Sequence, residues 1–256
     1  MTLPDEILGP TVVMVHGFLG FKDWAFFPWL ADLFAQAGLP AVRFNFSGSG
    51  MGAQKDGPFT QLDAFEKDTI TKQVEDLHAV LDALKNGSLA PGLPAREKAV
   101  LWGHSRGGGI CLLAAVDREE VAGIAAWAAI SRVNRYFFEM KKAWREKGFH
   151  PIESSRTGQA LKYSTDLLED VEKWGAAGDI PAFLHRLDVP VLFIHGTQDD
   201  SVKPDESESL AALHPRSSLA ILAEANHKFN ASHPFTGPPP VLLDAAARTL
   251  RFYQSL

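Results

Sequence analysis

A serine enclosed by glycines is the first residue whose surroundings point to chemistry. Residues 103–107 read GHSRG and match the pattern G-x-S-x-G. This segment lies between an apolar run that ends at Trp102 and a stretch of helical character that starts near Gly107. In such a strand-turn-helix context the two glycines allow a strained turn, which holds the serine hydroxyl exposed above a sheet. The pattern therefore predicts that Ser105 is a nucleophile.

A serine hydroxyl is a weak nucleophile near neutral pH, so it needs a base to take its proton and a carboxylate to orient that base. Two candidate carboxylates, Asp199 and Asp200, follow an apolar run that ends in His195 and Gly196. We predict Asp199 as the acid, because it lies three residues beyond the glycine that ends the strand. Asp200 is the alternative. The simplest other interpretation makes both aspartates solvated turn residues.

The base must follow the acid in the chain and come just after the next strand. Of the nine histidines, His214, His227 and His233 follow the acid. We expect His214 to end a helix on the wrong side of the sheet. His227 follows Leu222, the end of a predicted strand, by five residues, a length that can loop back over the strand ends. We predict His227 as the base, with His233 as the alternative.

A tetrahedral oxyanion needs hydrogen-bond donors, and two backbone amides are enough to bind it. The first predicted donor is the amide of Arg106, at the start of a helix where the dipole also favours negative charge. The second is the amide of Phe18, in the loop 16–20 after the first apolar run. We expect His16 to pack at the rim of the site rather than to act in catalysis.

Alternating strands and helices must position these residues. Apolar, β-branched runs predict strands at 11–15, 41–46, 98–102, 121–130, 191–195 and 218–222. Apolar residues at helical spacing predict helices at 24–37, 62–84, 107–116 and 241–253. This alternation predicts an α/β fold with a mostly parallel sheet and helices on both faces, which binds ligands at the carboxyl ends of its strands.

The segment 131–187 interrupts this alternation, because it has no predicted strand and two segments of helical character, 134–147 and 164–175. We therefore expect residues 1–256 to form a single α/β domain in which 131–187 is a small helical cap insertion. Between 131 and 150, basic residues outnumber acidic ones and alternate with aromatic residues. We interpret this stretch as a helix with an apolar face on the core and a basic face in solvent. The alternative is a surface that selects an aromatic or acidic acyl group.

Composition excludes several classes of partner. The chain is 46% hydrophobic and 22% charged, as in ordinary folded proteins. A formal charge of −6 gives no attraction to nucleic acid or to anionic lipid. The first residues lack the features of a secretory signal, and the apolar stretch 121–130 is too short to cross a bilayer. We expect a cytoplasmic protein that binds neither nucleic acid nor a membrane, and no prediction of oligomeric state follows.

Three observations argue against a metal or cofactor. Cys111 is the only cysteine, which excludes an intramolecular disulfide or a thiolate cluster and favours a small buried core residue. No histidines or acidic residues recur at the spacing of H-E-x-x-H. Residues 48–53 fit the dinucleotide-binding pattern G-x-G-x-x-A, but the following KDGP at 55–58 blocks the helix that this pattern must open.

Several short motifs together resemble the α/β-hydrolase superfamily over nearly the whole chain. They are H-G-F-x-G at 16–20, G-H-S-R-G-G at 103–108, G-T-x-D-x-x-V at 196–202 and N-H at 226–227. The segments 43–50 and 156–158 are similar to dienelactone-hydrolase-like and cinnamoyl or feruloyl esterase-like proteins. True dienelactone hydrolases use a cysteine nucleophile, so Ser105 favours the esterase branch.

This resemblance implies an α/β-hydrolase fold and hydrolysis of a small-molecule carboxylic ester through a Ser105, His227 and Asp199 triad, without a cofactor. Two alternatives from other classes stay open. A peptidase or acyltransferase of the same fold is one, because 156–163 also resembles segments of prolyl-oligopeptidase-type catalytic domains. A catalytically inactive binding protein is the other, although all three triad positions are filled.

Overall fold

A six-stranded parallel sheet forms the centre of the computed structural model, which describes all residues from 1 to 256. The strand order is β2-β1-β3-β4-β7-β8, and every neighbouring pair is parallel. The predicted α/β class with a parallel sheet is therefore confirmed. The strands are β1 (Thr11–Val15), β2 (Ala41–Arg43), β3 (Ala99–His104), β4 (Val121–Trp127), β7 (Val191–Gly196) and β8 (Ser217–Leu222).

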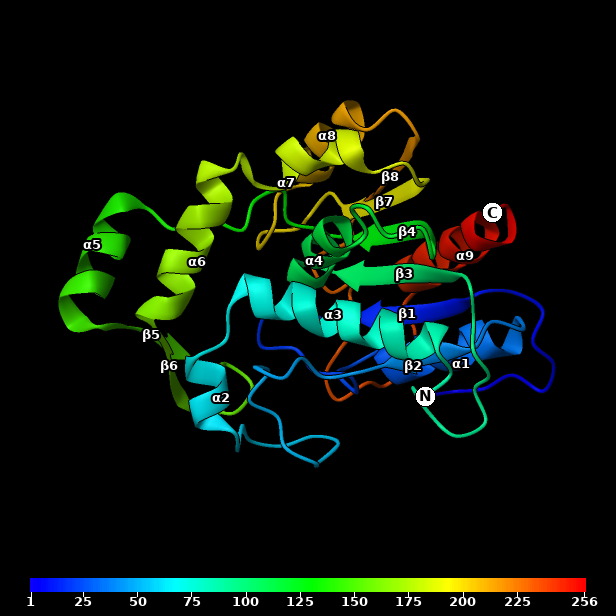
Figure 1. Ribbon diagram of the computed structural model, residues 1–256, viewed down its shortest axis with the longest axis horizontal. Helices are drawn as coiled ribbons and strands as arrows, with labels where there is room; N and C mark the ends of the chain where they lie inside the picture. Colours follow the sequence, from blue (N-terminus) through cyan, green and yellow to red (C-terminus); the bar gives the residue numbers. More distant parts are fainter.

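Helices cover both faces of this sheet (Figure 1). Because successive side chains of a strand point to opposite faces, Val12 and Met14 pack with α1 and α9, whereas Val13 and Val15 pack with α3 and α4. No helix is both long enough and apolar enough to span a membrane. The helices outside the insertion are α1 (Phe27–Gln36), α2 (Leu62–Glu66), α3 (Ile70–Lys85), α4 (Arg106–Ala114), α8 (Pro204–Leu213) and α9 (Pro240–Gln254).

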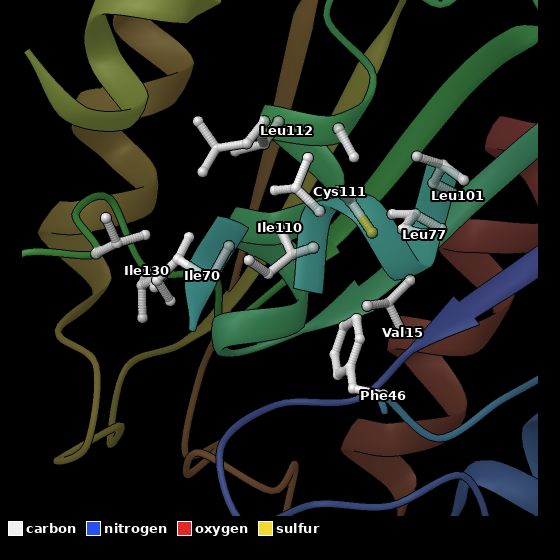
Figure 2. Packing of buried hydrophobic residues seen from close by; sticks show 14 of the residues in the cluster. Val15, Phe46, Ile70, Leu77, Leu101, Ile110, Cys111, Leu112 and Ile130 are labelled. Carbon is white, nitrogen blue, oxygen red and sulfur yellow. The ribbon is translucent and has the colours of Figure 1, made fainter. Parts of the chain in front are cut away.

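The helix that follows the predicted nucleophile is buried almost along its whole length. Figure 2 shows Ile110 and Cys111 of α4 in one buried cluster with Ile70 and Leu77 of α3 and Val15 of β1. Burial raises the pKa of the Cys111 thiol, which is the behaviour of the inert core residue that we predicted. Such packing holds the start of α4 rigidly against the sheet.

The predicted helix 62–84 is two helices in the structure, α2 and α3. The chain leaves helical geometry at Thr69, whose backbone is extended at φ −140° and ψ 162°. Its hydroxyl accepts a hydrogen bond from the amide of Lys72 at 3.2 Å and so caps α3. Apolar residues occur at helical spacing on both sides of Thr69, so periodicity alone did not reveal that the helix is interrupted there.

Two predicted strands end earlier than the apolar runs that suggested them. Strand β2 stops at Arg43, and the amide of Phe46 donates instead to His16 Nε2 at 3.3 Å. Strand β4 stops at Trp127, and Ala128 follows with a positive φ of 46°. After each of these strands the chain turns at the carboxyl edge of the sheet. Binding sites of parallel sheets are built there from loops rather than from paired strands.

The segment 131–187 connects β4 to β7 and lies beyond the carboxyl ends of the strands, with α5 and α6 on the left of Figure 1. The prediction that this insertion contains no strand is wrong. Strands β5 and β6 pair as an antiparallel hairpin, from Phe149 opposite Ser164 to Glu153 opposite Ala160. The elements of the insertion are α5 (Phe138–Lys147), β5 (Phe149–Glu153), β6 (Ala160–Ser164), α6 (Thr165–Ala176), α7 (Asp179–Phe183) and a 3-10 turn (Leu184–Arg186).

Side-chain contacts tie this hairpin to the rest of the molecule. Leu161 and Tyr163 of β6 are buried, whereas the alternate residues are more exposed. The side chain of Gln159, in the hairpin turn, bonds to the amide of Phe59 at 2.7 Å and to its carbonyl oxygen at 3.0 Å. Trp144 Nε1 of α5 donates to the carbonyl oxygen of Ser164 at 3.1 Å. These contacts hold the hairpin turn over the edge of the sheet.

Candidate active site

Ser105 occupies the sharp turn between β3 and α4. Its backbone has φ 58° and ψ −123°, a conformation that residues other than glycine rarely adopt. Its amide donates to the carbonyl oxygen of Trp127 at 2.8 Å, and its carbonyl oxygen accepts from the amide of Gly108 at 3.0 Å. The turn thus places the Ser105 side chain at the carboxyl edge of the sheet.

Close packing of α4 against β1 makes this turn possible. A Cβ atom at Gly107 would overlap with the carbonyl oxygen of Val15 and lie 2.6 Å from that of His16. Any side chain at this position would push α4 away from the sheet. The glycine therefore sets the distance between the helix behind Ser105 and the loop that follows β1.

Asp199 lies in the loop after β7 and is fully buried. One carboxylate oxygen, Oδ1, accepts hydrogen bonds from the amides of Ser201 and Val202 at 2.9 Å each. The other, Oδ2, lies 3.1 Å from His195 Nε2 and 2.7 Å from His227 Nδ1. Burial alone would raise the pKa of Asp199, but the hydrogen bonds from these histidines lower it below its usual value. The carboxylate is therefore ionised at neutral pH.

His227 lies in the loop after β8, and its backbone and ring are both held. Because Asp199 Oδ2 is an acceptor, the ring donates to it through Nδ1–H. The carbonyl oxygen of His227 accepts a hydrogen bond from His104 Nε2 at 2.8 Å. Its own Nε2 has no protein partner, and the ring lines the same two cavities as Ser105. The hydroxyl of Ser105 likewise bonds to no protein group. The structure therefore brings Ser105, Asp199 and His227 to one place.

The alternative acid and the first excluded histidine lie elsewhere. The Asp200 side chain is 96% exposed and pairs with Lys203 at 3.0 Å, so it faces solvent and not the histidine ring. His214 is buried, and its Nε2 donates to the carbonyl oxygen of Leu187 at 2.9 Å. Neither residue lines the cavities beside Ser105.

His233, the alternative base, lines the larger cavity but has both ring nitrogens engaged. Its Nδ1 accepts the amide proton of Ala25 at 3.1 Å. Its Nε2 therefore carries the proton and lies 3.2 Å from Asp56 Oδ2. No ring nitrogen is left to accept a proton from a serine, in contrast to His227.

The two predicted oxyanion donors lie beside Ser105. A Cβ atom at Gly17 would lie 2.9 Å from the carbonyl oxygen of His104 and 3.0 Å from Ser105 Cβ, so the loop after β1 touches the nucleophile turn. Phe18 is the next residue of this loop, and Arg106 begins α4. The amides of Phe18 and Arg106 donate to no protein group. Both are free to bind an oxygen atom of a ligand.

Two cavities meet at the candidate site. One has a volume of about 520 Å³ and the other about 310 Å³, and Phe18, Ser105 and His227 line both. The hairpin turn of the insertion, 154–156, closes one side of the larger cavity. Tyr136, also from the insertion, lines the smaller one. A ligand whose central atom lies near Ser105 can therefore extend in two directions.

His195 is a functional candidate that the sequence reasoning missed. It is the penultimate residue of β7 and is fully buried. Its Nε2 lies 2.9 Å from the carbonyl oxygen of Val202 and 3.1 Å from Asp199 Oδ2, so this nitrogen carries the proton. Its Nδ1 accepts the hydroxyl proton of Ser207 at 2.7 Å. The spacing of four residues between His195 and Asp199 could have indicated this contact from the sequence. We used His195 only to mark the end of the predicted strand.

Two further buried histidines support the site in their neutral form. Burial lowers the pKa of His16 to about 4 and that of His104 to about 3. His16 Nδ1 bonds to the carbonyl oxygen of Gly17, and His104 bonds to that of His227. Each ring thus fixes the backbone of a loop that borders Ser105, which agrees with the packing role expected for His16.

We expect these histidines to make the protein unstable in acid. Unfolded histidines titrate near pH 6.5, so between about pH 6.5 and 4 the unfolded state binds protons that the folded state does not, and stability falls as the pH falls. The loss is on the order of 3 kcal/mol for each histidine at pH 4. Thermal unfolding between pH 7 and 4 measures it.

Matched variants test the assignment of this acid lability. His104→Gln should reduce the loss of stability between pH 7 and 4 by on the order of 3 kcal/mol, because the contribution of one buried imidazole with a lowered pKa is gone. His185→Gln, at an exposed histidine, should leave the loss unchanged. An equal decline in wild type and His104→Gln contradicts the explanation.

The sheet order, the turn at Ser105 and the Asp199–His227 pair define the α/β-hydrolase class of folds. The sequence matches the model of the family described as "Alpha/beta hydrolase family" over residues 12–237. The chain belongs to the alpha/beta hydrolase family. This membership confirms the predicted superfamily and supports an enzyme of the hydrolase class.

This chain is similar to only part of each curated relative. The chain is 28% identical over 193 residues to a polyketide transferase of Penicillium sp., which covers 73% of this chain and 60% of the relative. It is 31% identical over 106 residues to a putative methylesterase 12 of Arabidopsis thaliana, covering 41% of this chain and 25% of the relative. The matched segments thus span less than two thirds of these relatives.

Solved structures agree on the fold over nearly the whole chain. A putative hydrolase from Agrobacterium vitis superposes with a TM-score of 0.73 at 21% identity, covering 98% of this chain and 90% of the other. Est1E from Butyrivibrio proteoclasticus, for which a structure with bound ferulic acid exists, superposes with a TM-score of 0.70 at 16% identity, covering 98% and 89%. At these identities the likeness concerns the fold.

Proposed function

We propose that this protein is a serine hydrolase that cleaves a carboxylic ester through Ser105, His227 and Asp199. One observation carries the proposal. His227 donates its Nδ1 proton to the buried, ionised Asp199 at 2.7 Å, and its unpartnered Nε2 belongs to a ring that shares two cavities with Ser105. A carboxylate that fixes the tautomer of a histidine in this way prepares its other nitrogen to accept a serine proton.

The proposed reaction has two steps. Ser105 Oγ attacks the ester carbonyl carbon while His227 Nε2 takes the hydroxyl proton, and the amides of Phe18 and Arg106 bind the oxyanion. Collapse breaks the bond to the alcohol oxygen, which leaves with the proton from His227, and an acyl-enzyme forms. Water then attacks this acyl-enzyme with the same histidine as base, which releases the acid and restores the serine.

The insertion 131–187 acts as a cap in this proposal. Its hairpin turn borders the larger cavity, and Val133, Arg135 and Tyr136 border the smaller one. Because the insertion contributes walls to both cavities, it determines which acyl and alcohol groups fit beside Ser105.

Ester hydrolysis is the experiment that tests the proposal. We expect release of p-nitrophenol from short p-nitrophenyl esters with an initial burst equal to the enzyme concentration, because the acyl-enzyme forms before it hydrolyses. Methyl cinnamate-type esters beside aliphatic methyl esters test the esterase branch. A preparation that is folded, as judged by circular dichroism, and cleaves none of these esters would falsify the proposal.

Asp199→Asn should lower kcat on these esters by on the order of 10³–10⁴, because an amide can leave the histidine in the wrong tautomer. Asp200→Asn is the matched control, since the neighbouring carboxylate is exposed and paired with Lys203. We expect it to stay within about twofold of wild type. Comparable losses in both variants would contradict the choice of Asp199.

Acyl transfer is the second candidate, and the similarity to a polyketide transferase favours it. The acyl-enzyme of a transferase passes its acyl group to an acceptor other than water. Added alcohols would then raise the rate of p-nitrophenol release while the yield of free acid falls. A constant ratio of acid to p-nitrophenol at all alcohol concentrations leaves hydrolysis as the reaction.

A further inference from the structure

The side chain of Arg106 lines the smaller cavity directly beside the nucleophile. Its guanidinium donates from Nη1 to the Tyr163 hydroxyl at 3.2 Å and stacks over the Phe18 ring, 4.6 Å from the ring centre. It forms no ion pair with a carboxylate of the chain. Burial alone would lower its pKa, but the neighbouring tyrosines and Asp68 raise it, so the group stays charged.

No other charged group near this cavity forms an ion pair with Arg106. No aspartate or glutamate lines the cavity, and its second cation, Arg135, already pairs with Glu206 at 2.7 Å. Asp68 is buried nearby without an ion pair, and Gln73 donates to its Oδ2 at 2.5 Å while Oδ1 has no partner. Burial raises the pKa of Asp68 to about 6, against the influence of Arg106. The cavity therefore presents one unpaired cation.

A half-buried guanidinium without an anionic partner is unfavourable, and an anion that enters the cavity offsets this. The planar fork of an arginine binds a carboxylate through two parallel hydrogen bonds. The cavity holds about 310 Å³, roughly ten water volumes, which is enough for a short carboxylate-bearing chain. Its apolar walls, which include Ile70 and Ile130, suit the methylene groups of such a chain.

We propose that the ester substrate carries a carboxylate, which the Arg106 side chain binds in the smaller cavity while Ser105 attacks the ester carbonyl. This inference rests on the proposed function and specifies the substrate class of the same site. The carboxylate can belong to the acyl half, as in a half-ester of a dicarboxylic acid, or to the alcohol half. The two sources require separate substrates in the test.

Two pairs of esters separate these sources. The acyl pair is p-nitrophenyl hydrogen glutarate and p-nitrophenyl pentanoate, and the alcohol pair is 4-carboxyphenyl butanoate and its neutral methyl-ester analogue. The readout is the ratio of kcat/KM for the anionic ester to that for its neutral partner. Because both esters are measured on one preparation, intrinsic reactivity and any loss of folded enzyme cancel when ratios are compared between variants.

Arg106→Met should lower this ratio by about 10- to 100-fold in one of the two pairs, the range expected for one hydrogen-bonded charge pair. The change should come mainly from KM, because the contact is made in the ground state as well as in the transition state. Arg106→Lys keeps the positive charge, so its ratio should lie between those of wild type and Arg106→Met. Arg135→Met is the matched control, since that cation is already paired, and should change the ratio by less than about threefold.

The outcomes separate the inference from the proposed function. A ratio that Arg106→Met leaves unchanged in both pairs overturns the inference, even if all four esters are cleaved. An equal fall with Arg135→Met also overturns it, because the effect is then the general positive potential of the cavity. If wild type cleaves none of the four esters, the proposed function fails and the inference falls with it.

Discussion

Ser105→Ala is expected to lower kcat for ester hydrolysis by at least about 10⁴, an effect matched only by loss of the proposed base. The variant removes the only atom that can form the acyl-enzyme, whereas the cavities and the two amides beside them stay in place. The initial burst should disappear together with the steady-state rate. Stopped-flow measurement of p-nitrophenol release records both.

The fold should survive this substitution. The Ser105 hydroxyl bonds to no protein group, and the main-chain bonds that hold the turn do not involve it. Ser209→Ala, at an exposed position of α8, serves as the control for serine replacement and should match wild type in activity. A Ser105→Ala enzyme with an unchanged Tm that keeps its burst would rule out this nucleophile.

His227→Gln is expected to lower kcat by on the order of 10⁴–10⁶, because no other group can take the Ser105 proton. Glutamine can still accept or donate a hydrogen bond near Asp199, but it does not bind a proton at neutral pH. The same loss should appear in the formation and in the hydrolysis of the acyl-enzyme. Single-turnover kinetics separates the two steps.

His233→Gln tests the competing assignment at equal size and polarity. Both ring nitrogens of His233 are engaged, with the amide of Ala25 and with Asp56. Replacing the imidazole of His233 should therefore change only the shape of the larger cavity. We expect kcat to fall by less than about tenfold. If His233→Gln lost as much activity as His227→Gln, our assignment of the base would be wrong.

The parts of the fold that follow from local pattern were predictable. Buried parallel strands read as short apolar runs, so β1, β3 and β7 were found within one or two residues. The glycines at 103 and 107 indicated the turn at Ser105, because that turn needs backbone without side chains. The meeting of Asp199 and His227, the proposed acid and base, followed from where strands end, since loops at one sheet edge meet.

The remainder depends on contacts between distant residues. The β5–β6 hairpin has a proline, Pro151, and only partial burial in β5, so its alternation is weak until it is paired with β6. The second histidine contact of Asp199 depends on how β7 packs against α8, which carries Ser207. Whether Arg106 forms an ion pair depends on which carboxylates the tertiary structure brings near it. The residues adjacent to Arg106 in the sequence do not indicate this.

The contact of Gly107 with the backbone of Val15 and His16 determines where this protein can be redesigned. A side chain there would strike main-chain oxygen atoms, which cannot rotate away as a flexible neighbour can. Directed-evolution libraries that include position 107 would thus consist mainly of unfolded clones. Exposed positions of the insertion that line the cavities, such as Ser155 and Arg135, carry no such restriction. Mutational tolerance is therefore concentrated in the walls of the cavities, and new substrate ranges can be selected there without disturbing the turn that carries Ser105.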